Sequence, residues 1–122
     1  MIQEGKGKVL FVDDEKFPEW FNLPRDTHHA RTYQQAVAMW SSGNYNVLYL
    51  DYDLNDGMNG ADLLNCLCTK KVPEKVYCIS INQTGGINSL KTVCEIGWKV
   101  PFEDIGRKMM FERFTILDGQ GG

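Results

Sequence analysis

Two acidic motifs each follow directly on an apolar run that is typical of a buried strand. The sequence VLFVDDE occupies residues 9–15, and VLYLDYD occupies residues 47–53. Carboxylates that lie close together cannot all ionise without a counter-charge. A hard divalent cation meets this need, and Mg²⁺ is usually held by one or two carboxylates together with water and phosphate oxygens. The residue types therefore predict a Mg²⁺ site, with Asp13, Asp14, Asp51 and Asp53 as candidate ligands.

The elements that would position these acids alternate between strand-like and helix-like patterns. We expect strands over residues 8–12, 28–31, 45–50, 76–81 and 98–102. We expect helices from the capping motif at Thr32 to Gly43, after Asn59, from Asn88 to Gly97, and over most of 103–117. This alternation is typical of a parallel sheet with helices on both faces. The predicted fold class is α/β, a single three-layer domain with about five parallel strands.

The first helix of such a domain is expected to be short. The segment FPEWFNLP carries prolines at positions 18 and 24, which leave room for little more than one helical turn. We expect Phe17, Trp20 and Phe21 to cover the sheet face that a full helix would otherwise cover.

Crossover connections in parallel sheets are right-handed, so the carboxyl ends of all strands meet at one edge, where ligands bind. This rule brings the two acidic motifs together with Ser80, at the end of the fourth strand. The segment NQTGG at 82–86 follows that strand, and its glycines allow backbone N–H groups to turn toward an anion. We therefore expect a phosphate site beside the metal, made by Ser80, Asn82, Thr84, Gly85 and Gly86.

Composition narrows the class of protein. The 122 residues carry a net charge of −3 without a basic stripe, which argues against nucleic acid as the partner. The absence of a membrane-length apolar run and of a secretory leader predicts a cytoplasmic protein. Its four cysteines are interpreted as reduced core thiols. We expect one domain over 1–122, with flexible termini at 1–7 and 118–122.

The motifs VLFVDDE, LYLDYDLNDGMNG and a fourth strand that ends at Ser80 resemble the receiver domain of two-component response regulators. The resemblance covers residues 8 to about 102 and implies a flavodoxin- and receiver-like fold with bound Mg²⁺. It also implies that Asp13 and Asp14 are the acidic pair of the family. Asp51 then matches the phosphoacceptor, and Ser80 the hydroxyl that senses the phosphoryl group.

Several departures make the chain more similar to a receiver-like subgroup proposed to process cyclic phosphates. The acidic run followed by proline, the short first helix and the motif Ser80-x-Asn82-x-x-Gly85 are typical of that subgroup. Its members carry two histidines where this chain has Tyr52 and Ile79. The receiver lysine is also displaced, because Lys99-Val100-Pro101 would turn Lys99 to the wrong side of the fifth strand.

Three consecutive apolar residues near the end of the chain, Met109, Met110 and Phe111, would span more than half of a helix circumference. One helix cannot turn all of them toward one sheet, so we expect a surface that binds a protein partner or a second copy in a homodimer.

Three functional hypotheses remain open at this point. The first is a stand-alone regulatory module with a Mg²⁺ and phosphate pocket that acts through protein contact. The second is a non-catalytic receiver fold that serves as an adaptor or inhibitor. The third is a small Mg²⁺-dependent enzyme for cyclic or terminal phosphates. The lack of an output segment after residue 117 favours the first two, and the loss of both histidines argues against the enzyme.

Overall fold

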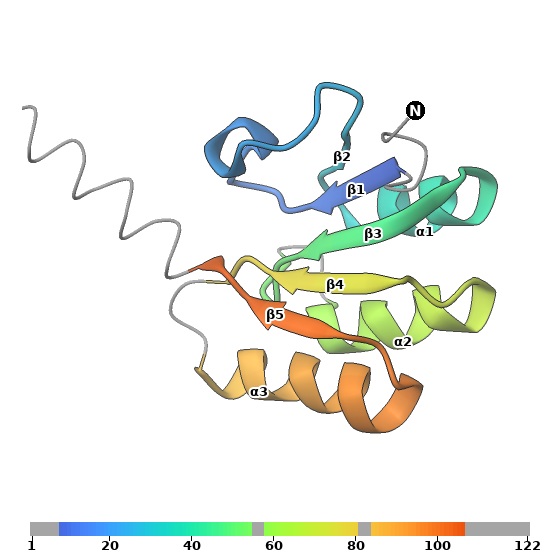
Figure 1. The fold of residues 1–122 in the computed structure, drawn as a ribbon, viewed down its shortest axis with the longest axis vertical. Coiled ribbons are helices and arrows are strands. Elements are labelled where there is room, and N and C mark those ends of the chain that lie inside the picture. Colours follow the sequence, from blue (N-terminus) through green and yellow to red (C-terminus); the bar gives the residue numbers. More distant parts are fainter. Residues whose placement is uncertain (1–7, 55–57, 81–83, 107–122) are drawn as a thin grey trace, which may run out of the picture.

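Five parallel strands form a single sheet in the order β2-β1-β3-β4-β5 (Figure 1). The computed structural model describes residues 8–54, 58–80 and 84–106. The strands are β1 (Lys8–Val12), β2 (His28–Ala30), β3 (Tyr45–Leu50), β4 (Lys75–Cys78) and β5 (Phe102–Asp104). This order reverses direction between β1 and β3, so a crevice for ligands is expected at their carboxyl ends. The predicted α/β fold class is confirmed.

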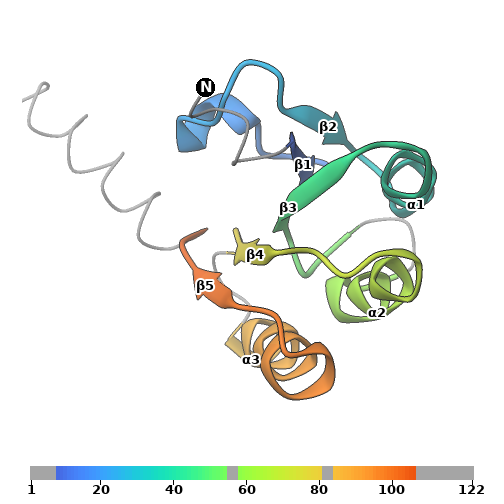
Figure 2. The same cartoon turned by 45° about the vertical axis from the view of Figure 1, so that its right-hand side comes forward.

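Three helices cover one face of the sheet (Figures 1 and 2). They are α1 (Tyr33–Ser42), α2 (Gly60–Lys70) and α3 (Thr84–Thr92), and α3 continues into the π-helix η3 (Val93–Trp98). Their apolar sides bury one cluster against the strands, which includes Leu10, Leu48, Trp40, Leu64 and Leu90. Burial of side chains this large is the main source of stability for the domain.

The predicted cap at Thr32 is present, and Asn59 caps the next helix. The Thr32 hydroxyl accepts a hydrogen bond from the Gln35 backbone N–H at 3.1 Å, and the Gln35 side chain accepts one from the Arg31 N–H at 2.7 Å. At α2, the Asn59 side chain accepts from the Asp62 N–H at 2.8 Å. Each cap satisfies a backbone donor that the helix itself leaves unpaired.

The opposite face is covered, among the described residues, by the single turn η2 (Pro18–Phe21). Phe21 packs there with Phe11 and Ile79, and Trp20 lies against this cluster. The expected one-turn helix is therefore confirmed, and two of its aromatic residues cover the sheet. Phe17 differs from the prediction, because this residue is 40% exposed and its ring lies beside Trp20 and His29.

Three elements have a boundary that differs from the prediction by more than one residue. The fifth strand is Phe102–Asp104 and not 98–102, because η3 extends the preceding helix to Trp98 and Lys99 ends it in the left-handed region (φ 61°). Glu103 therefore belongs to a strand and not to a helix, and its exposed charge suits an edge strand. The fourth strand ends at Cys78. The third difference, the start of α3 at Thr84 and not at Asn88, affects the candidate phosphate site.

The predicted partner surface, Met109, Met110 and Phe111, lies outside the described residues. The four cysteines are free thiols, and burial raises the pKa of Cys68 and Cys78 to about 11 and that of Cys94 to about 12. Over the described ranges, no helix is both long enough and apolar enough to cross a membrane.

Candidate metal and phosphate site

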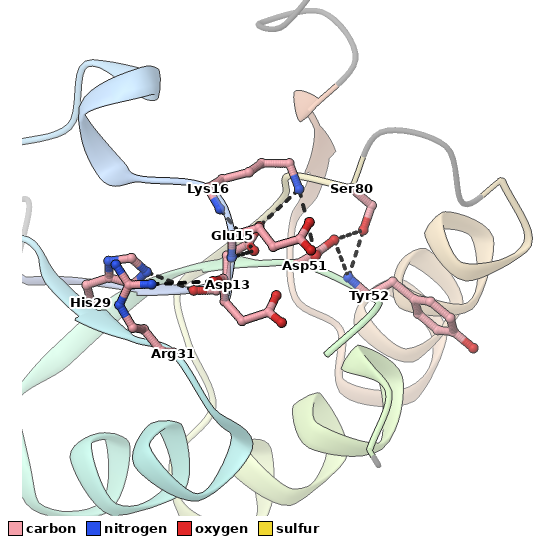
Figure 3. A network of polar contacts seen from close by, with 9 residues as sticks. Asp13, Glu15, Lys16, His29, Arg31, Asp51, Tyr52 and Ser80 are labelled. Carbon is pink, nitrogen blue, oxygen red and sulfur yellow. Dashed lines mark hydrogen bonds and ion pairs between the residues drawn. The ribbon is translucent and has the colours of Figure 1, made fainter. Parts of the chain in front are cut away.

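Three strands deliver the candidate site to one edge of the sheet (Figure 3). Val12 at the end of β1 pairs with Leu50 at the end of β3, and Leu50 pairs with Cys78 at the end of β4. The residues that follow these strand ends must therefore converge. Asp13, Asp14 and Asp51 each offer a carboxylate oxygen within 4.8 Å of the others. The predicted convergence of the two acidic motifs is present in the structure.

Asp13 is fully buried and closes the turn after β1. Its Oδ1 accepts hydrogen bonds from the backbone N–H groups of Glu15 at 2.8 Å and Lys16 at 3.3 Å. Its own carbonyl lies 2.8 Å from Nε2 of His29, which must be protonated there because a carbonyl only accepts. Asp13 thus shapes the loop and also presents its second oxygen, Oδ2, to the pocket.

Asp51 and Ser80 form a tight pair across β3 and β4. The Ser80 hydroxyl donates to Asp51 Oδ1 at 2.6 Å. The Tyr52 backbone N–H lies 2.9 Å from the same oxygen and 2.7 Å from Ser80 Oγ, so it is shared between them. Oδ1 therefore accepts the hydrogen bonds from the protein, and Oδ2 lies 3.7 Å from the Lys16 ammonium.

The pKa of Asp51 is raised above its ordinary value. Burial of the carboxylate is the main cause and the nearby charge of Asp13 adds to it, while the Ser80 hydroxyl, Lys16 and the Tyr52 N–H oppose the shift. A nearby cation would stabilise the ionised form of this carboxylate.

Lys16 is such a cation, and sequence reasoning missed it. Its side chain is 10% exposed, and its ammonium lies 3.0 Å from Asp13 Oδ2 and 3.7 Å from Asp51 Oδ2. The sequence signal for it is its position three residues after Asp13, where the turn folds the side chain back over the acid. A lysine is almost never this deeply buried unless it is paired.

The three acids fit a hard divalent cation by the chemistry of their donors. They offer clustered carboxylate oxygens, the ligands that Mg²⁺ prefers, and they stand at a switch point of the sheet. Asp53, the fourth predicted ligand, is exposed and outside this group, and its backbone bridges to Asn59.

The predicted phosphate loop differs from its expected form. Gly85 and Gly86 lie in the first turn of α3 and not in a turn before a helix, because α3 starts at Thr84. A Cβ at Gly86 would lie 2.3 Å from the Tyr52 ring, so this glycine makes room for that ring. Asn82 lies outside the described residues, and the side chain of Thr84 is also outside them.

The position of Lys99 also differs from the prediction. Lys99 precedes β5 entirely, is exposed, and donates to the carbonyl of Ile96 at 3.3 Å. It therefore sits at the amino end of the strand, away from the acids, and not on the wrong side of the strand itself. The described residues at the carboxyl end of β5 are Asp104, Ile105 and Gly106, none of which is a cation.

No imidazole replaces the two histidines of the subgroup pattern. The chain has two histidines, and His28 lies beside the Tyr45 hydroxyl at 2.5 Å while His29 holds the Asp13 carbonyl. Ile79 is buried with Phe11 on the opposite face, and the Tyr52 ring lies against Gly86. A side-chain proton shuttle of that type is absent from the described pocket.

The strand order and the acidic edge define a receiver-like domain. The family model for the cyclic-phosphate processing receiver domain matches residues 8–94, and the chain belongs to this family. No curated protein sequence is detectably similar to the chain.

Solved structures with the same fold include several receiver domains. A CheY-like response regulator receiver domain from Methanospirillum hungatei superposes with a TM-score of 0.62 at 16% identity, covering 94% of this chain and 96% of that one. The receiver domain of the Francisella response regulator 1452 gives a TM-score of 0.56 at 20% identity, covering 95% and 99%. The signal receiver domain of a LuxO repressor protein from Vibrio parahaemolyticus gives 0.62 at 18% identity, covering 92% and 88%. At these identities the likeness concerns the fold.

Proposed function

We propose that this protein is a receiver-like regulatory module whose acidic pocket binds Mg²⁺ and a phosphate group, and which acts by protein contact. The observation that carries the proposal is the cluster of Asp13, Asp14 and Asp51, one oxygen of each within 4.8 Å of the others. Ser80, hydrogen-bonded to Asp51 at 2.6 Å, stands where a hydroxyl could respond to a group bound there.

Asp13, Asp14 and Asp51 would hold the metal. When bound, Mg²⁺ would neutralise the clustered carboxylates and attract phosphate oxygens. The chain's own contribution is the fixed geometry: the backbone N–H groups of Glu15 and Lys16 orient Asp13, and Ser80 with the Tyr52 N–H orients Asp51. Both carboxylates are thereby held through Oδ1, and Oδ2 of each faces the Lys16 ammonium, at 3.0 Å for Asp13 and 3.7 Å for Asp51.

We propose from the sequence that the module binds its protein partner through Met109, Met110 and Phe111. The module would bind a protein or a second copy of itself, and neither nucleic acid nor a membrane is proposed as its partner.

A Mg²⁺ titration tests the metal site. The melting temperature should rise by several degrees when Mg²⁺ exceeds its dissociation constant about 100-fold, because a ligand at that ratio stabilises by about 2.7 kcal/mol. Amide resonances of the segments around Asp13 and Asp51 should shift over the same range. The Asp51→Asn variant is the control, and its melting temperature should not respond. An unchanged melting temperature in the unmodified protein would leave the non-catalytic adaptor as the better description.

A second candidate function, processing of a cyclic phosphate, is favoured by the family model over residues 8–94. Against it stands the absence of an imidazole that faces the acids among the described residues. Mg²⁺-dependent turnover of a 2′,3′-cyclic nucleotide that is lost in Asp51→Asn would make the enzyme the better description. Mg²⁺ binding without turnover would support the regulatory module.

A further inference from the structure

The buried ammonium of Lys16 lies between carboxylates that come from two different strands (Figure 3). It approaches Oδ2 of Asp13 at 3.0 Å and Oδ2 of Asp51 at 3.7 Å. These are the oxygens left over after the backbone has taken Oδ1 of Asp13, and Ser80 with Tyr52 has taken Oδ1 of Asp51. Lys16 is therefore directed into the part of the pocket where a ligand would bind.

Lys16 contacts Asp13 more closely than it contacts Asp51. The 3.0 Å contact to Asp13 is a hydrogen bond, whereas the 3.7 Å separation from Asp51 is an ion pair without one. An ammonium group has three N–H donors, and one is engaged by Asp13. Donors remain for an oxyanion bound beside Asp51.

Among the described residues, the carboxyl end of β5 supplies no cation to the pocket. Asp104, Ile105 and Gly106 stand at the carboxyl end of that strand, and a Cβ at Gly106 would meet the Ser80 carbonyl at 2.3 Å. That end of β5 therefore packs closely on the backbone after β4. Lys16 forms ion pairs with both Asp13 and Asp51.

We propose that Lys16 is the anion-binding residue of the pocket: it donates to a phosphate group bound beside Asp51, and it shares the carboxylates with the metal. This inference rests on the proposed function. Before ligands bind, the ammonium holds Asp13 and Asp51 together. With Asp13 and Asp51 engaged by a metal ion, the Lys16 ammonium would turn toward the phosphate oxygens, which would again match its charge.

Removal of the ammonium should therefore have opposite effects on the two ligands. Lys16 competes with Mg²⁺ for Asp13 and Asp51, so Lys16→Met should bind Mg²⁺ alone several-fold more tightly. The same variant loses a charge-assisted donor to the anion, and its affinity for inorganic phosphate at saturating Mg²⁺ should fall at least tenfold. A lysine with a merely structural role would not produce this opposition.

The experiment measures both affinities by NMR titration or calorimetry, with Mg²⁺ alone and then with inorganic phosphate. Lys16→Arg keeps the charge and should retain phosphate affinity within a few-fold. Lys99→Met is the matched control, since this exposed lysine contacts Ile96 and none of the acids, and it should leave both affinities unchanged.

The outcomes separate the two proposals. Phosphate affinity that is unchanged in Lys16→Met, or Mg²⁺ affinity that falls together with it, overturns the role of Lys16 while the metal site stands. A wild-type chain that binds neither ligand overturns the proposed function instead. If Lys16→Met does not fold, the ammonium ¹⁵N resonance of Lys16 in the wild-type protein decides. It should shift when phosphate is added at saturating Mg²⁺, and a shift confined to other residues overturns the inference.

Discussion

On the β1–β3 side of the sheet's carboxyl edge, Asp13 and Asp51 are buried and held by backbone and side-chain donors, and Lys16 reaches both. On the β4–β5 side, Ser80 is buried, but Asp104, Ile105 and Gly106, the described residues at the end of β5, include no cation. The charged chemistry of the pocket is therefore concentrated in one loop and one strand end. The comparison shows that one buried acid of this edge, Asp13, and the lysine paired with it come from the same turn.

The largest change in stability is expected for the Asp13→Ala variant. It should lower the free energy of unfolding by about 3–5 kcal/mol, because Lys16 would lose its nearest partner while buried, and two backbone donors would lose their acceptor. Urea unfolding with EDTA present measures the effect. Asp53→Ala, at an exposed acid outside the cluster, should stay within about 0.5 kcal/mol. Equal losses in the two variants would mean that the β1 turn has no special energetic role.

Substitutions of Gly60, which packs beside Asp51, and of Gly85, in helix α3, test the same comparison between the two sides of the edge. A Cβ at Gly60 would lie 2.4 Å from the Asp51 carbonyl and 2.8 Å from Tyr52 Cα, so Gly60→Ala should destabilise by about 1–3 kcal/mol. It should also weaken Mg²⁺ binding, since the backbone of Asp51 must shift. Gly85→Ala meets no atom within 4 Å in helix α3 and should stabilise by about 0.4–1 kcal/mol. Thermal unfolding with and without Mg²⁺ compares them; a stabilising Gly60→Ala would contradict the close packing of α2 on β3.

A smaller effect is expected from Asp51→Asn in the absence of metal. Asparagine can keep the acceptor for Ser80 and Tyr52 and removes a charge whose pKa is raised by burial and by Asp13. Because the folded pKa lies above the unfolded value, the folded state binds more protons between them, and wild-type stability rises as the pH falls through the folded pKa.

The variant should therefore be more stable than wild type at neutral pH, and its advantage should shrink as the pH falls toward 4. Denaturant unfolding in EDTA at several pH values measures the difference between the two proteins. An advantage that is constant with pH would mean that the charge of Asp51 is not the cause.

The smallest change in stability is expected outside the described residues. Met110→Lys combined with Phe111→Lys should leave the free energy of unfolding within about 0.5 kcal/mol and abolish association with the partner or with a second copy. Sedimentation and pull-down with the wild-type chain as bait compare the two. A variant that unfolds would identify these side chains as core, and unaltered association would place the partner surface elsewhere.

Much of the fold was predictable because its signals are local. The strand over Tyr45–Leu50, the cap at Thr32 and the convergence of Asp13 with Asp51 follow from apolar runs, capping motifs and the handedness of crossovers. The fifth strand was misplaced because a π-helix lengthened the preceding element, which no periodicity indicated. Lys16 was missed because a lysine next to acids is usually exposed, and burial depends on the path of the turn.

The strand order has a consequence for how the chain folds. β1 pairs with β2 and β3, and β3 with β4, so the pocket draws on residues 13, 51 and 80 and is complete only after three distant strands have docked. Contacts between residues far apart in the sequence form slowly, because the chain loses the entropy of loop closure before these contacts stabilise it. We expect the pocket to close after the folding transition state. Changes in its charges, and bound Mg²⁺, should then alter the rate of unfolding and leave the rate of folding nearly constant.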